Sequence, residues 1–198
     1  MRQTMYQLDP RERERAREII AEIIRQAGGE LVNKTNLYKA FYHAHLEYAD
    51  KNLDYLSTWP IVRMPKGPGI HEADRLLGEL VSAGVLVIDE LQKGDVTAFR
   101  FRLCEQRLHD SPLKAREIAA IRYGVREVAG KTAGRASEDS HEASRAWREG
   151  TDGEELNIYL DRISDETVAQ EREAIKSLSE DAIHIFDRAR QTTHLPIS

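Results

Sequence analysis

The sequence lacks several features that would place it in a particular class of protein. Its 198 residues include a single cysteine, Cys104, so no disulfide can form within the chain. No apolar run approaches the roughly 18 residues that a membrane-spanning helix needs. The first residues also lack the apolar centre of a secretory signal peptide. We therefore expect a cytoplasmic protein that does not enter a membrane.

Motifs of catalytic chemistry are missing as well. The sequence has no serine nucleophile elbow, no Cys/His cluster and no dinucleotide-binding glycine pattern. The segment 66–69 (KGPG) lacks the spacing of a phosphate-binding loop. His71 and His141 are each followed by Glu, but neither has the second histidine of a zinc-protease helix. We therefore predict a non-enzymatic protein with no cofactor and no metal.

Charge is distributed unevenly along the chain, whose net charge is −5. Residues 1–137 hold 22 Lys and Arg against 19 Asp and Glu, whereas residues 138–198 hold 7 against 15. The acidic C-terminal third argues against nonspecific nucleic-acid binding by that part of the chain. Such an excess is typical of a solvated helical surface and would also suit a protein partner, and the sequence leaves both open.

The clearest structural pattern lies in residues 67–103. Apolar residues recur at helical spacing from Ala73 to Val81, and Gly84 then favours a helix end. The ranges 85–91 and 99–103 are rich in residues that favour strands, and the segment 92–95 between them contains a turn glycine. A helix followed by a two-stranded ribbon is the pattern of a winged helix.

Further helices are predicted on both sides of this unit. The pair Asp9 and Pro10 starts a helix that runs to Ala27, and residues 34–50 form a second helix that is apolar on nearly every side. A third helix follows Ser111 and Pro112, a short one covers about 156–163, and a long one covers 165–191. Residues 52–69 are predicted to form an apolar loop that packs on the domain, and residues 130–153 an irregular one.

These patterns predict a mainly α-helical protein with one small β-hairpin, built as a winged-helix-like core plus C-terminal helices. The core is expected to cover residues 1–135. Residues 136–198 are expected to form a polar loop and acidic helices that pack on the core or extend from it.

The helix before the ribbon decides between two functional hypotheses. In a DNA-binding winged helix this element would enter the major groove. Its exposed face is expected to carry three acidic side chains against one arginine, and phosphates would repel such a face. The residues of this face are His71, Glu72, Asp74, Arg75, Glu79 and Ser82. A protein-binding module is therefore the leading hypothesis, and a DNA-binding transcriptional regulator is the alternative.

Three segments together suggest a family. They are NLYKAFYHAHLEYADKN (36–52), KGPGIHEADRLLGELVSAGVL (66–86) after Trp59, and IAAIRYGVREVAGKTAGRASEDSHEASRAWREG (118–150). In their order and spacing they resemble the Panacea domain, a family of antitoxins that includes the SocA-like adaptor, over about residues 34–150. This resemblance implies a non-enzymatic antitoxin that binds and neutralises a toxin protein encoded beside it. It identifies no toxin-binding residues.

Four side chains are singled out as structural anchors or partner contacts: Trp59, His141, Trp147 and Arg148. Trp147 is the one large apolar side chain of its polar segment, so we expect it to hold that segment on the helical core. His141 is expected to form a local hydrogen bond. A small active site around His141 is the alternative for these residues, although a histidine in a polar segment is more often a surface or capping residue.

Overall fold

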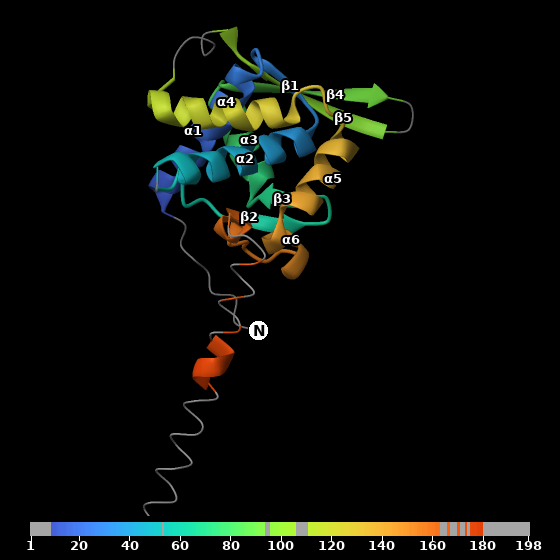
Figure 1. Cartoon of the computed structure of the whole chain (residues 1–198). Helices are drawn as coiled ribbons and strands as arrows, with labels where there is room; N and C mark the ends of the chain where they lie inside the picture. The colour runs from blue at the N-terminus through green and yellow to red at the C-terminus, as the bar shows by residue number, and fades with distance from the viewer. Residues whose placement is uncertain are drawn as a thin grey trace, which may run out of the picture. The chain divides into compact units, whose positions relative to one another are not determined.

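The computed structural model describes residues 9–52, 54–93, 96–105, 111–162, 166, 170, 173 and 175–179 (Figure 1). The chain divides into two compact units, residues 1–162 and 163–198. The boundary expected near residue 135 stays a prediction. Among the described residues, no helix has the length and apolar character needed to cross a membrane.

Three helices form the centre of the first unit. Helix α1 (Pro10–Gln26) begins at Asp9, whose carboxylate accepts a hydrogen bond of 2.8 Å from the Arg11 amide. Helix α2 (Lys34–Asn52) is buried on most sides, as its all-round apolar pattern predicts. Helix α4 (Ala115–Val128) packs along α2 so closely that a Cβ on Gly124 would meet the Ala40 carbonyl oxygen. The helices predicted at these three places are confirmed.

The predicted helix and ribbon are also present, with one strand more than expected. Helix α3 (Ala73–Ser82) precedes β4 (Leu86–Lys93) and β5 (Val96–Leu103), which pair antiparallel with Ile88 opposite Phe101. Strand β1 (Glu30–Val32) pairs with the other edge of β5, so the sheet has the order β1-β5-β4. In Figure 1 the far end of the β4–β5 ribbon extends beyond the helices.

A second sheet corrects the prediction of a single hairpin. Strands β2 (Ile61–Met64) and β3 (Gly67–Ile70) form an antiparallel pair within the segment predicted as an apolar loop. The sequence of β3 is Gly-Pro-Gly-Ile, and these residue types are poor strand formers. All four residues are buried. Because Gly67 has no side chain, Lys39 of α2 and Ser140 of α5 can approach this strand. The prediction followed local propensity, which these contacts override.

Residues 130–153 are helical for most of their length, so the prediction of an irregular loop there is wrong. Helix α5 (Ala133–Ala143) starts at Thr132, whose hydroxyl accepts from the Arg135 amide at 3.2 Å. Helix α6 (Arg145–Glu149) starts at Ser144, whose hydroxyl accepts from the Trp147 amide at 3.1 Å. The small polar residues that made this segment look irregular therefore act partly as helix caps.

A short 3₁₀ helix, η2 (Ile158–Arg162), closes the first unit where a short helix was predicted. The long helix predicted for residues 165–191 lies largely outside the described residues. Those described there, residues 166, 170, 173 and 175–179, are helical and exposed. The chain is thus mostly helical with two small antiparallel sheets.

Candidate functional site

The side chains of Trp147 and His141 stack on each other and join α5, α6 and the second sheet. Their ring centroids lie 3.7 Å apart with an angle of 4° between the planes, and the Arg63 guanidinium carbon lies 4.6 Å from the Trp147 ring. The Trp147 indole donates a hydrogen bond of 2.7 Å to the Met64 carbonyl, and Arg63 Nε donates one of 2.9 Å to the Trp147 carbonyl. This geometry suits the anchoring role expected of Trp147.

The carboxylate of Asp161 ties η2 to the start of α6. It accepts hydrogen bonds from the Tyr42 hydroxyl at 2.8 Å, the Ser144 hydroxyl at 2.7 Å and the Ala146 amide at 2.8 Å. Tyr42 and Ser144 are both fully buried. Burial and the nearby Asp161 charge raise the pKa of Tyr42, so its hydroxyl stays a donor. Asp161 therefore satisfies polar groups that water cannot reach.

Lys39 is a buried lysine at the centre of the site. It is 1% exposed, and its ammonium donates a hydrogen bond of 2.8 Å to the Pro68 carbonyl. A Cβ on Gly67 would meet both Lys39 Nζ and Ser140 Oγ and would lie 3.1 Å from the His141 ring, so these groups surround one point of β3. Burial lowers the pKa of Lys39 to about 7. Burial and the Lys39 charge also lower the pKa of His141, which favours a neutral imidazole.

A cavity of about 530 Å³ lies beside Lys39, between the first turn of α2, the β2–β3 turn and β5. Of the described residues, three lysines, Lys34, Lys39 and Lys66, line it together with one acid, Asp74, which pairs with Lys34. Much of the rest of its wall is apolar and is formed by Tyr38, Met64, Pro65, Ala98, Phe99 and Ala133, while Asn33, Thr35 and Thr97 add polar groups. The lining thus combines apolar surface with an excess of positive charge.

The remaining singled-out residues lie in different places. Arg148 is exposed and donates hydrogen bonds to the carbonyls of His141 at 3.2 Å and Glu142 at 2.5 Å, at the C-terminal end of α5. Trp59 is 2% exposed, and its indole donates a hydrogen bond of 2.9 Å to the His71 carbonyl just before α3. The structure therefore brings His141, Trp147 and Arg148 together, while Trp59 secures another part of the fold.

The geometry around His141 offers little support for the alternative of a small active site. The Ser137 hydroxyl lies 3.4 Å from His141 Nε2, but it donates its hydrogen bond to the Lys66 carbonyl at 2.9 Å. A serine nucleophile would instead need to give that proton to the histidine. Within the described part of the chain, no three His, Cys, Asp or Glu side chains are grouped to hold a metal ion. The absence of catalysis stays a prediction.

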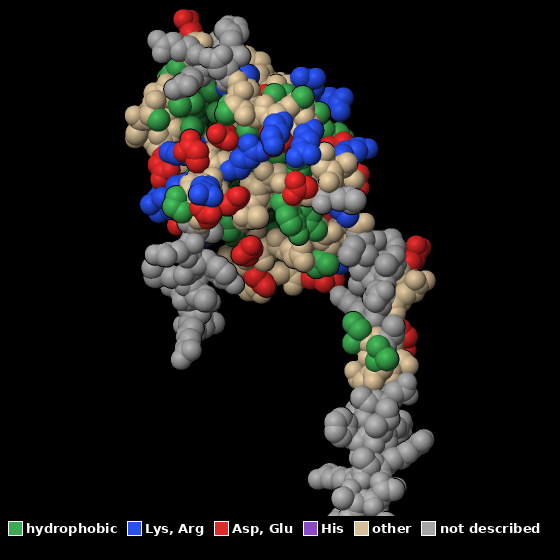
Figure 2. Space-filling model, turned by 90° about the vertical axis from the view of Figure 1, so that its left-hand side faces the viewer, with side chains coloured by type: hydrophobic (Ala, Val, Ile, Leu, Met, Phe, Trp, Pro, Cys, Tyr) green, Lys and Arg blue, Asp and Glu red, His purple; other side chains and the backbone are tan. Residues whose placement is uncertain are grey.

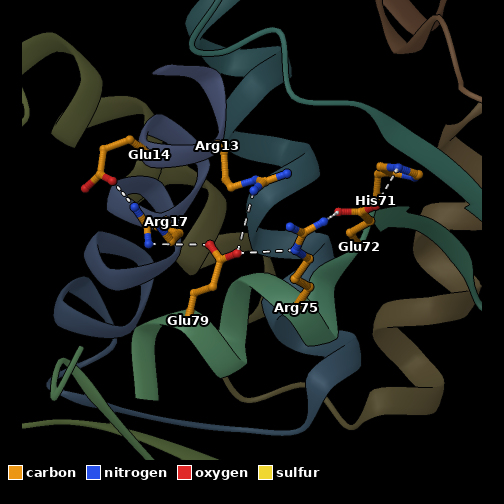
Figure 3. Close-up of polar contacts among 7 residues, drawn as sticks. All are labelled: Arg13, Glu14, Arg17, His71, Glu72, Arg75 and Glu79. Carbon is orange, nitrogen blue, oxygen red and sulfur yellow. Dashed lines mark hydrogen bonds and ion pairs between the residues drawn. The ribbon is translucent and has the colours of Figure 1, made fainter. Parts of the chain in front are cut away.

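Helix α3 carries a network of ion pairs with α1 (Figure 3). Glu79 pairs with Arg13 at 3.9 Å and Arg17 at 3.4 Å from α1, and with Arg75 at 3.3 Å on α3 itself. Arg75 also pairs with Glu72 at 3.3 Å. Glu79 therefore faces α1 more than the solvent. Arg75, the one arginine of α3, pairs with Glu79 on the same helix and with Glu72, the residue just before it.

Lys39, Arg63 and Asp161 belong to this site although the sequence patterns did not single them out. A charged residue inside an otherwise apolar helix is a signal that could have marked Lys39. No comparable sequence signal identifies Asp161 and Arg63, because the residues to which they bond lie far away in the chain.

Comparison with known proteins assigns no function to these residues. No protein-family model matches the chain, and no curated protein or solved structure matches it either. The Panacea-domain resemblance therefore stays a prediction that depends on the three segments quoted above.

Proposed function

We propose that this protein is a non-enzymatic protein-binding module, and specifically an antitoxin that binds and neutralises a toxin protein encoded beside it. The charge pattern of α3 is the observation that carries the proposal. The Panacea-domain resemblance supplies the kind of partner.

The arrangement of elements supports a winged-helix-like core. The order α1, β1, α2, α3, β4, β5 with the sheet order β1-β5-β4 is the arrangement expected of a winged helix, and β2–β3 is an insertion between α2 and α3. In this interpretation α3 occupies the position of a recognition helix. Its surface chemistry therefore indicates which partner the core binds.

That surface is poorly suited to DNA. Glu72 and Asp74 are exposed and form ion pairs with Arg75 and Lys34, respectively, and Arg75 is also engaged by Glu79. Phosphates need unpaired Lys or Arg side chains near the groove-binding helix, and exposed carboxylates repel them. On the face shown in Figure 2, Lys and Arg side chains gather in one band and Asp and Glu lie mostly beside and below it, so that face does not carry one sign of charge.

The outer side of the ribbon leads to the same conclusion. Asp89 on β4 accepts a hydrogen bond of 2.8 Å from Arg102 and lies 3.4 Å from Arg100, both on β5. Arg100 also lies 3.8 Å from Glu30 on β1. Arginines that would contact a DNA backbone are thus already paired within the sheet. Exposed carboxylates on α3 instead suit a partner protein with a basic surface.

Co-expression with the neighbouring toxin gene tests the proposal. The wild-type protein should restore growth and co-purify with the toxin. The double variant Glu72→Lys/Asp74→Lys should lose both effects, because it reverses the charge of the proposed contact face. Its matched control is Glu138→Lys/Glu142→Lys, the same charge change at exposed positions of α5, which should still rescue growth.

The opposite results would reject the proposal. A wild-type protein that neither rescues growth nor co-purifies is not an antitoxin for that toxin. A salt-sensitive mobility shift with promoter DNA that is strengthened by Glu72→Lys would favour the transcriptional regulator.

A further inference from the structure

We propose that the cavity between the first turn of α2 and the β2–β3 turn binds a small organic anion. The ligand class is a phosphate or carboxylate group carried on an apolar body about the size of an aromatic ring. This site shares Asp74 with the proposed partner-binding face, but it does not depend on the antitoxin assignment.

The size and lining of the cavity suit such a ligand. Its volume of about 530 Å³ lies within the usual range of small-molecule sites, which combine apolar walls with a few polar groups. The rings of Tyr38 and Phe99, with Met64 and Pro65, offer apolar surface for the body of the ligand. A purely inorganic ion would leave most of this surface without contact.

The charges of the wall select an anion. Among the described residues, three lysines line the cavity, Lys34, Lys39 and Lys66, and one acid, Asp74. Asp74 pairs with Lys34, so within the cavity lining Lys66 is uncompensated, and so is Lys39 below about pH 7, where its ammonium is charged. The first residues of α2 also line it, and the backbone amides of a helix start favour negative charge.

Lys39 provides the strongest argument, because its surroundings lack a negatively charged partner for its ammonium group. It is 1% exposed and has the Pro68 carbonyl as its hydrogen-bond partner. No carboxylate among the described residues forms an ion pair with it. Buried charges in proteins are normally paired, since leaving water without a counter-ion is costly. An anion in the cavity would place a negative charge beside this group.

A competing interpretation assigns Lys39 only a structural role. Its hydrogen bond to Pro68 joins α2 to β3, and this bond alone would explain a lysine at this position. The two interpretations differ in their demands on Lys66, which is exposed at the β2–β3 turn and contributes to the site only if the cavity binds an anion.

Titration calorimetry of the full chain with phenyl phosphate at about pH 6, where the Lys39 ammonium is charged, tests the proposal, with phenol as the uncharged comparison. Phenyl phosphate should bind saturably and raise the melting temperature, and phenol should do neither at the same concentration. Lys39→Met should weaken binding at least about 10-fold, the loss expected for a buried charge-assisted hydrogen bond. Lys66→Gln should weaken it about 2- to 5-fold, because its charge is more exposed.

Lys51→Gln is the matched control, since Lys51 is an exposed lysine near the opposite end of α2. Its affinity for phenyl phosphate should equal that of the wild type. The proposal is overturned if phenol binds as tightly as phenyl phosphate, if no saturable binding occurs, or if Lys51→Gln weakens binding as much as Lys66→Gln. If circular dichroism shows that Lys39→Met does not fold, the comparison of Lys66→Gln with Lys51→Gln decides.

Discussion

The buried lysine of α2 leads to a specific prediction about the pH dependence of stability. Lys39 has an ordinary pKa of 10.5, and burial lowers this pKa to about 7 in the folded chain. Between these two values the unfolded chain binds a proton that the folded chain does not. Stability therefore rises with pH in this window, whereas below about pH 7 both states are charged and the dependence ends. Lys39→Met removes this contribution.

The magnitude follows from proton linkage. Each pH unit inside the window is worth about 1.4 kcal/mol per differing proton. From about pH 7.5 to about pH 8.5 the folded lysine is mostly neutral and the unfolded one charged, which gives about 1.2 kcal/mol. The histidines nearest to this charge do not interfere, because burial lowers the pKa of His43 to about 4 and also lowers that of His141. Both are neutral throughout the range.

Urea denaturation followed by circular dichroism at several pH values measures this effect. The free energy of unfolding of the wild type minus that of Lys39→Met should increase by about 1 kcal/mol over this range. Loss of the hydrogen bond to Pro68 changes the difference in unfolding free energy by the same amount at every pH. The slope of that difference with pH is therefore unchanged. Lys51→Met, at an exposed site on the same helix, should run parallel to the wild type. A difference for Lys39→Met that is flat with pH would refute the reasoning.

Three further predictions concern the free energy of unfolding, measured in the same way. Trp147→Ala should lower it by about 3 kcal/mol by removing a ring packed on the core, whereas His141→Ala should cost about 1 kcal/mol, near the value of one aromatic contact. Asp161→Ala should cost about 2–3 kcal/mol, because it leaves buried donors unpaired. Gly124→Ala should cost about 1–3 kcal/mol, since its new methyl group meets α2. Gly78→Ala, with nothing near its Cβ, should instead stabilise α3 by about 0.5–1 kcal/mol.

For each of these predictions a specific result would contradict the reasoning. If Trp147→Ala keeps full stability but loses toxin neutralisation, the ring is a partner contact rather than an anchor. Equal effects of Gly124→Ala and Gly78→Ala would contradict the close approach of α4 to α2. An unchanged stability for Asp161→Ala would mean that its three hydrogen bonds are replaced by water.

Local sequence patterns were sufficient for the elements whose signals lie within one stretch of chain. The apolar repeat from Ala73 to Leu80 and the cap formed by Asp9 indicate α3 and the start of α1 without any distant partner. The alternation around Phe101 likewise predicts the ribbon, because one face of a strand is buried at every second residue. These elements form where the sequence predicts them, since periodicity alone decides which side of a helix or strand becomes apolar.

Only the tertiary structure decided the second sheet and the site beside it. A Gly-Pro-Gly segment becomes a buried strand because its backbone takes space next to Lys39 and Ser140, not because of its own propensity. The role of Asp161 depends on Tyr42, which lies far away in the sequence. Local sequence patterns determined helices α1 to α4 and the ribbon but not α5 and α6. Long-range packing determined which polar side chains lose contact with water, and that burial produces the chemistry of Lys39.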